Sequence, residues 1–300
     1  MPIDTLVLAD AVAHSADHPL IKLPSGFMLW SAYCTQLVLS GLITVLLGGY
    51  VARHVGTGSE GEGNKRYLTK NPFASLIEVI CVYLRDELCR PLLGSRTDKL
   101  MPFLWSLFFF ILVNNFLGLI PFLDLVSLFD PHGIHDEHRS FIGGTATQSI
   151  YVTGALAVCA ALFINIQGIK ELGVVEYLKH LTGGVPLQPA FYPIAGLVFI
   201  IEIASTFIKP IALAIRLFAN MTAGHVLLAQ LFIFTGAGIV AFLPATVGGF
   251  AVYLLEIFVA FLQAFIFMFL TAVFTSLLAH HDEHEEEHDA VPEGAAVAAG

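Results

Sequence analysis

The sequence predicts an all-α polytopic membrane protein with about five membrane helices and one amphipathic helix. Of its 300 residues, 56% are hydrophobic and only 13% are charged, and the mean hydropathy is +0.78. An ordinary soluble domain carries about 25% charged residues. Several stretches also reach the roughly 20 mostly apolar residues that a membrane helix needs. We expect a single membrane domain over 27–279, with an outer segment 1–26 before it and a disordered, acidic, His-rich cytoplasmic tail 280–300 after it.

The first 170 residues of the chain contain three predicted membrane helices. The first covers about Phe27–Val51 and is followed by a loop rich in Gly, Ser and Glu. The second covers about Met101–Leu123, and the third about Ala146–Ile169, with a short amphipathic link 170–187 after it. Between the first two, Pro72–Pro91 has apolar residues at helical spacing with charges interleaved. That pattern predicts an interfacial or packed amphipathic helix rather than a span.

The last third of the chain is too long for two ordinary membrane helices. Two runs, Pro189–Gly236 and Ala245–Ala279, are almost continuously apolar. Their few charged or titratable side chains are Glu202, Lys209, Arg216, His225 and Glu256. Helices of this length would extend about 50–70 Å, whereas the hydrocarbon core is about 30 Å thick. Each run is therefore either divided into two spans or strongly tilted.

The distribution of Lys and Arg predicts the orientation. Eight of the 14 basic residues fall within 51–100, whereas 123–145 contains only Arg139. By the positive-inside rule, the first loop and the link 170–187 are cytoplasmic. The N-terminus is then outside and the C-terminal tail is cytoplasmic. No basic segment precedes the first apolar run, so we expect neither a cleaved signal peptide nor a transit peptide, which favours the inner membrane of a bacterium.

Charged groups inside membrane spans indicate a functional site, because each costs at least about 2.5–3.5 kcal/mol at a helix centre. Glu202, Lys209 and Arg216 are spaced by seven residues, so they stay close to one helix face. His225 follows Arg216 by nine residues, which puts it on roughly the opposite face and about 13 Å further along. Glu256 and a glutamine seven residues later share one face of the second run.

An antiparallel hairpin brings these groups together. Pairing His225 with Glu256 and pairing Arg216 with Gln263 require almost the same turn, near residue 240, where glycines and a proline interrupt the run. Arg216 then separates Glu202 from the His225–Glu256 pair. Because arginine stays protonated, it repels a proton that a glutamate would pass on. The arrangement predicts two proton half-channels that do not connect directly.

Taken singly, each of these residues also fits a purely structural role. Arg216 could extend its side chain to an interface, His225 could be a packed and hydrogen-bonded histidine, and Glu256 could serve helix packing. Two other function classes also use intramembrane charges. A secondary transporter would show inverted repeats, which we do not find in the sequence. A structural scaffold for partner assembly would tolerate the replacement of Arg216.

Three segments resemble subunit a of the F-type ATP synthase. They are "KPIALAIRLFANMTAGHVLL", "LEIFVAFLQAFIFMFLTAVF" and "FFFILVNNFLGLIP", and the resemblance extends over about 72–278. It implies a non-catalytic proton-channel subunit of the ATP synthase complex, embedded in membrane lipid. The implied partners are the ring of c subunits and the peripheral-stalk b subunits. Protons would enter from outside, ride on the ring and leave to the cytoplasm, coupling proton flow to rotary ATP synthesis.

The resemblance also implies roles for individual residues. Arg216 matches the family's essential arginine, which faces the ring carboxylate and keeps it ionised as it passes. His225 and Glu256 match an acid–histidine pair on the inlet side whose order is reversed in many relatives. Glu202 and Ser205 would line the exit side.

Two further matches and one departure complete this comparison. Asn220 and Gln263 match polar positions near the arginine. The last two runs would be the family's long tilted helices. The third span departs from the family pattern, because Gln148 and Ser149 stand where an acid or asparagine is common.

The sequence predicts no cofactor, no bound metal and no nucleic-acid surface. It contains no Walker-type glycine loop, no CxxC among its four cysteines, and only scattered basic residues. The histidines of the loop 124–144 and of the tail lie in acidic segments, which predicts solvated side chains rather than a metal site. They are His132, His135, His138, His280, His281, His284 and His288. A proton is the favoured ion, although sodium use would depend mainly on the c subunit.

Overall fold

The protein folds into long helices preceded by a short two-stranded ribbon. A computed structural model of the chain describes residues 19–22, 28–55, 69, 71–120, 146–180, 192–235 and 239–279. Strands β1 (Pro19–Lys22) and β2 (Met28–Ser31) pair antiparallel. Five stretches are long and apolar enough to cross a membrane: Ala32–His54, Pro72–Leu119, Ile150–Lys170, Gly196–Gly224 and Phe242–Ser276. The predicted class, an all-α polytopic membrane protein, is confirmed; the ribbon was not predicted.

Helix α2 (Ala32–His54) begins later than predicted. The sequence placed its start at Phe27, but the residues up to Ser31 belong to β2. The Ser31 side chain then caps the helix by accepting a hydrogen bond from the Cys34 backbone N–H at 3.4 Å. An N-cap serine satisfies one of the otherwise unpaired N–H groups of the first turn, so the helix starts at Ala32.

The predicted amphipathic helix forms and then turns back on itself. It consists of α3 (Pro72–Tyr83), a π-helical turn η2 (Leu84–Cys89) and α4 (Arg90–Leu93). A short 3₁₀ turn, η3 (Gly94–Arg96), leads into α5 (Thr97–Leu119). Gly94 has φ 55°, a conformation open mainly to glycine. The Trp105 indole N–H donates to the Cys81 carbonyl at 3.2 Å, so α5 packs back against α3.

Helix α7 (Ile150–His180) combines the predicted third span and part of the link that follows it. It is preceded by a 3₁₀ turn, η5 (Ala146–Gln148). Gly173 has φ 78° and ψ 162°, which are not helical, so the helix axis changes direction there. The seven residues after this kink therefore do not continue the line of the span.

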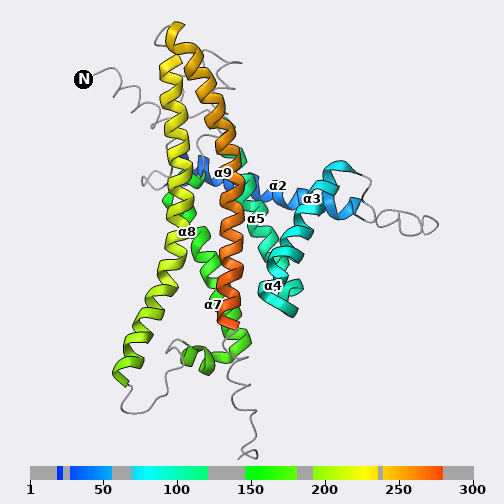
Figure 1. The fold of residues 1–300 in the computed structure, drawn as a ribbon, viewed down its shortest axis with the longest axis vertical. Helices are drawn as coiled ribbons and strands as arrows, with labels where there is room; N and C mark the ends of the chain where they lie inside the picture. The colour runs from blue at the N-terminus through cyan, green and yellow to red at the C-terminus, as the bar shows by residue number, and fades with distance from the viewer. Residues whose placement is uncertain are drawn as a thin grey trace, which may run out of the picture.

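The last two runs form one hairpin of two unbroken helices. α8 (Tyr192–Thr235) has 44 residues and α9 (Ile239–Ala279) has 41, and they lie side by side over most of their length (Figure 1). The alternative of four shorter spans is therefore wrong. At 1.5 Å per residue the helices are about 60–66 Å long, twice the hydrocarbon thickness. Figure 1 shows α2 running crosswise to this hairpin, and both observations support the predicted tilt.

The hydrophobic core lies where α5 and α9 meet. Phe108 of α5 and Phe267 of α9 are completely buried, and the Phe108 ring meets Phe261 edge-on with centroids 5.6 Å apart. At the far end of α9, the Ser276 hydroxyl donates to the Leu92 carbonyl of α4 at 2.6 Å. α5 also packs against α2. These contacts hold the α8–α9 hairpin against the rest of the described helices.

The turn at Gly94 gives a testable prediction about stability. Gly94→Ala should lower the free energy of unfolding by about 1–3 kcal/mol, because a Cβ is strained at this positive φ, although no neighbouring atom lies within 4 Å of it. The matched control is Gly49→Ala in α2, where the space is also open and alanine favours the helix. Heating detergent-solubilised membranes and following the folded fraction by size-exclusion chromatography measures both. Equal midpoints for the two variants would contradict the prediction.

Candidate functional site

Glu256 of α9 packs directly onto Gly224 of α8. A Cβ added at Gly224 would lie 2.1 Å from Glu256 Oε1 and 2.8 Å from its carboxyl carbon. Only a residue without a side chain leaves room for the carboxyl group at this point. The predicted hairpin register, with its turn near residue 240, is therefore confirmed at the level of the backbone. His225 is the next residue after Gly224, so its position on α8 also lies level with Glu256.

The Glu256 carboxyl group belongs to a set of buried polar atoms without partners. Within the described part of the chain, neither Glu256 oxygen receives a hydrogen bond from protein. Hydrogen-bond partners are also lacking there for the buried side-chain oxygens of Asn114, Asn115, Thr147, Gln148 and Thr222 and for the amide nitrogen of Gln263. Each unpaired buried group costs about 1–3 kcal/mol. These residues come from α5, η5, α8 and α9: α5 and α8 pack against α9, and η5 packs against α5 and α8. Buried groups of this kind are usually satisfied by water.

A glutamine from α2 holds part of this set in place. Gln36 is 1% exposed, and its amide accepts a hydrogen bond from the Ala146 N–H at 2.7 Å and donates to the Asn114 carbonyl at 3.3 Å. Asn115 in turn donates to the Ala260 carbonyl of α9, one turn after Glu256, at 3.2 Å. The start of η5 and the two asparagines of α5 are thus fixed beside the Glu256 end of the hairpin.

Arg216 lies on the exposed face of α8. In the described residues it has no hydrogen-bond or ion-pair partner, and no hydrogen bond joins it to Gln263. Gln263 is 3% exposed. The predicted pairing of Arg216 with Gln263 therefore stays a prediction. Along α8, Arg216 lies between Glu202 and Gly224, about 21 Å from the first and about 12 Å from the second.

The remaining predicted site residues lie on α8. Ser205 and Asn220 are half-buried on α8. His225 is on α8, and the contact between its side chain and Glu256 stays a prediction. The histidines of the loop 124–144 and the tail 280–300 lie outside the described residues.

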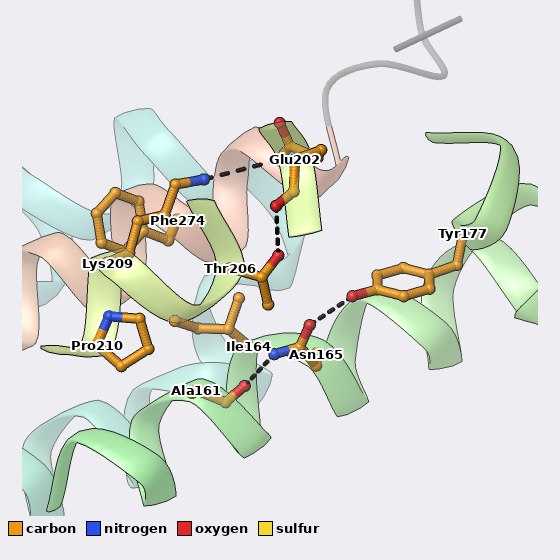
Figure 2. Close-up of a pocket in the computed structure, with 9 residues that line it drawn as sticks. All are labelled: Ala161, Ile164, Asn165, Tyr177, Glu202, Thr206, Lys209, Pro210 and Phe274. Carbon is orange, nitrogen blue, oxygen red and sulfur yellow. Dashed lines mark hydrogen bonds and ion pairs between the residues drawn. The ribbon is translucent and has the colours of Figure 1, made fainter. Parts of the chain in front are cut away.

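A second polar site surrounds Glu202. The Lys209 ammonium lies 3.8 Å from Glu202 Oε1 and 5.2 Å from the centre of the Phe274 ring of α9. The Thr206 hydroxyl donates to the Glu202 backbone carbonyl at 3.0 Å. Figure 2 shows these groups around a cavity whose opposite wall is α7, with Asn165 and Tyr177 facing α8. The cavity is about 40 Å³ in the volume open to the centres of water molecules.

Sequence reasoning missed several of these residues. Gln36, Asn165 and Tyr177 were not singled out, because a polar residue near a helix end is common and carries no signal by itself. Lys209 was noted for its spacing from Arg216, but its pairing with Glu202 was not predicted. The seven-residue interval between Glu202 and Lys209 is too long for an ordinary i,i+4 pair, so only the long lysine side chain makes the contact.

Comparison with known proteins gives the family. A family model described as "ATP synthase A chain" matches residues 16–276. The chain belongs to this family. The "ATP synthase subunit a" of Myxococcus xanthus is 37% identical over 224 residues, 72% of this chain and 65% of the relative. Those of Chloroherpeton thalassium and Anaeromyxobacter dehalogenans are 36% and 39% identical, over 76% and 73% of this chain.

The matched regions leave part of each relative uncovered. They span 65%, 63% and 53% of the Myxococcus, Chloroherpeton and Anaeromyxobacter proteins. The matched 16–276 include every helix that the structure describes up to the last turn of α9. The hairpin and both polar sites therefore lie inside the family region.

The contact between Gly224 and Glu256 predicts a disulfide. In a chain whose four native cysteines are replaced by alanine, Gly224→Cys with Glu256→Cys should cross-link on oxidation. The Cβ of residue 224 would lie 3.1 Å from Glu256 Cγ, which places the two Cβ atoms within the range that a disulfide spans. Gel mobility after thiol blocking measures the cross-link.

The control pair is Gly224→Cys with Ile239→Cys, because residue 239 begins α9 far from Gly224 along the hairpin. Two outcomes would show that α8 and α9 pair in a different register: cross-linking of the control pair as fast as the 224/256 pair, or no cross-linking of the 224/256 pair.

Proposed function

We propose that this chain is the proton-translocating channel subunit of an F-type ATP synthase and has no catalytic activity of its own. Two offset half-channels, separated by Arg216, would protonate and deprotonate the carboxylate of a c ring and couple proton flow to rotary ATP synthesis. The observation that carries the proposal is the order of groups along the α8–α9 hairpin. Glu256 of α9, whose carboxyl oxygens are buried and have no partner among the described residues, lies on one side of Arg216, and Glu202 lies beside a cavity on the other.

The first half-channel would lead to Glu256 and His225. A carboxyl group without a protein partner at membrane depth is costly, and such a group is expected to exchange protons with water or a neighbouring base. The unpaired polar atoms of Asn115, Thr147 and Gln148 supply hydrogen-bonding positions nearby. Gln148 and Ser149 stand where an acid or asparagine is common in the family, and Gln148 would take its part in this chain.

Arg216 would act at the ring surface. Its exposed side chain has no partner among the described residues, so an acid supplied from outside the chain could meet it. A fixed cation favours the ionised form of a nearby carboxylate, and the passing ring carboxylate would stay charged until it reaches the first half-channel. The same charge opposes direct proton transfer between Glu256 and Glu202. Asn220 and Gln263 would orient the water and side chains near the arginine.

The second half-channel would release the proton at Glu202 and Ser205. Glu202 lies near the start of α8, on the side of the link that the positive-inside rule makes cytoplasmic. The proton would then leave through the cavity beside Glu202. With this orientation the N-terminus is outside, the tail is cytoplasmic, and the chain is a multi-pass protein of a bacterial inner membrane.

The proposed partners are the c ring and the peripheral-stalk b subunits. α8 exposes large apolar side chains along with Arg216, among them Phe207, Ile208, Ile211 and Ile215. An exposed apolar surface of this kind faces lipid or another membrane helix. The Arg216 side of α8 would face the ring, and other exposed helices would contact lipid and the stalk.

The first functional prediction concerns Arg216. Arg216→Ala should abolish ATP-driven proton pumping in inverted membrane vesicles, because the ring carboxylate then has no fixed counter-charge. The complex should still assemble, since Arg216 has no partner within the described chain. Quenching of a pH-sensitive dye measures pumping, and copurification with the c ring measures assembly.

Arg53→Ala, at the exposed end of α2, is the matched control and should pump normally. Full pumping by Arg216→Ala in an assembled complex would rule out the channel assignment and favour a scaffold. A chain that never copurifies with a c ring would favour a transporter.

The second functional prediction concerns Gly224. Gly224→Ala should reduce pumping about 10- to 100-fold, because the added methyl group displaces the Glu256 carboxyl group and small misplacements of a reacting group are costly. The fold should survive, since the displaced group is the end of a flexible side chain. The same vesicle assay measures it.

Gly196→Ala, on the same helix with no atom within 4 Å of the added Cβ, should leave pumping unchanged. Wild-type pumping by Gly224→Ala would mean that the position of Glu256 is not important for transport.

A further inference from the structure

Helix α7 folds back onto the second polar site after its kink. Tyr177 follows Asn165 by twelve residues, which in a straight helix would separate them by about 18 Å. The non-helical Gly173 removes that separation, and the Tyr177 hydroxyl donates to Asn165 Oδ1. The Asn165 amide donates to the Ala161 carbonyl at 2.6 Å. Tyr177 is only 9% exposed, although it lies beyond the stretch that could span the membrane.

The fold-back makes the wall of a cavity that opens on Glu202. Tyr177 and Asn165 lie on the α7 side, with Glu202, Thr206 and Lys209 across from them on α8 (Figure 2). The remaining walls are Ala161, Ile164, Pro210 and Phe274. A volume of about 40 Å³ for water centres exceeds the 10–15 Å³ that one water needs. The cavity is therefore large enough for water and has polar partners for it.

Groups on both polar walls have partners within the protein. Burial raises the pKa of Tyr177, and the negative charge of Glu202 raises it further, so its hydroxyl stays a hydrogen-bond donor. Lys209 is restrained twice, by the Glu202 carboxylate and by the face of the Phe274 ring, where a cation is attracted. Among the described side chains that line the cavity, Glu202, Lys209 and Tyr177 are the titratable ones.

We propose that Tyr177, Asn165 and Lys209 complete the cytoplasmic outlet of the proton route at Glu202. Tyr177 and Asn165 form the wall that confines water against Glu202, and Lys209 is the positioning residue that directs the Glu202 carboxylate toward this water. The inference rests on the proposed function, because it places these residues on the route of the transported proton. It assigns Tyr177 and Asn165, which the sequence analysis did not single out, and Lys209, which it gave no specific role, a part in proton release.

The first test measures access of water to the cavity. The four native cysteines of this chain are first replaced by alanine, and Thr206→Cys or Phe207→Cys is then introduced. Thr206 lines the cavity, whereas Phe207 is 66% exposed but is not part of the cavity lining. A cationic, membrane-impermeant methanethiosulfonate is added to inverted vesicles, which expose the cytoplasmic face.

We expect Thr206→Cys to react at least about tenfold faster than Phe207→Cys, because thiolate forms readily only in contact with water. Adding Tyr177→Ala should speed the reaction further by removing the wall. Equal rates at 206 and 207, or no effect of Tyr177→Ala, would overturn the inference.

The second test separates positioning from packing at Lys209. Lys209→Gln should lower ATP-driven pumping about two- to fivefold, the effect expected for loss of one half-exposed ion pair, whereas Lys209→Arg should restore it. Tyr177→Phe, which removes only the hydroxyl group, should lower pumping over the same range. Normal pumping by Lys209→Gln, or equal loss in Lys209→Gln and Lys209→Arg, would overturn the positioning role.

Measuring pumping by Arg216→Ala in the same assay separates the proposed channel function from the outlet role of Tyr177, Asn165 and Lys209. If Arg216→Ala still pumps, the proposed function fails and the inference fails with it. If Arg216→Ala stops pumping while the Lys209 and Tyr177 variants pump normally, only the inference fails.

Discussion

The close approach of α8 and α9 at Gly224 determines how the functional groups of this protein are arranged. A glycine on one helix lets the carboxyl group of Glu256 occupy the space between the two backbones. That contact fixes the register of two helices of 44 and 41 residues. The register in turn sets how far Glu256 of α9 lies from Arg216 of α8, whereas Glu202 and Arg216 belong to the same helix. A hydrogen bond from Asn115 of α5 to α9 and another from Ser276 of α9 to α4 then fix the position of α9 along its axis.

The two polar sites differ in how their groups are satisfied. Around Glu202, the buried and half-buried groups have protein partners: an ammonium for the carboxylate and a tyrosine hydroxyl for the Asn165 amide. Around Glu256, several buried oxygen and nitrogen atoms have none within the described chain. A stable core would avoid such groups, and proteins retain them mainly where function requires it. The polar atoms around Glu256 therefore depend on hydrogen bonds from outside the described residues, such as those of water.

The sequence was sufficient to predict the hairpin because charge is rare and costly in a membrane. Arg216, Glu202 and Glu256 stand out against an apolar background, and their spacing alone restricts the turn. It was not sufficient for contacts that depend on a single backbone conformation. The direction of α7 after Gly173 follows from one positive φ angle, and a glycine inside a helical pattern is more often tolerated without a kink. The pairing of Tyr177 with Asn165 and the cap at Ser31 depend in the same way on tertiary geometry that periodicity does not contain.

The unbroken length of α8 also has a mechanical consequence. Pro210 lies inside this helix, between Lys209 and Arg216, yet the helix continues past it. A hinge at this point would let each half of the hairpin yield separately to a sideways force. A continuous pair of helices, anchored to α5 and to α4, instead shares such a force along its whole length. If Arg216 faces a rotating ring, as proposed above, the two helices would bend less under the pressure of that ring, and less of the energy of the ion gradient would be lost in bending them.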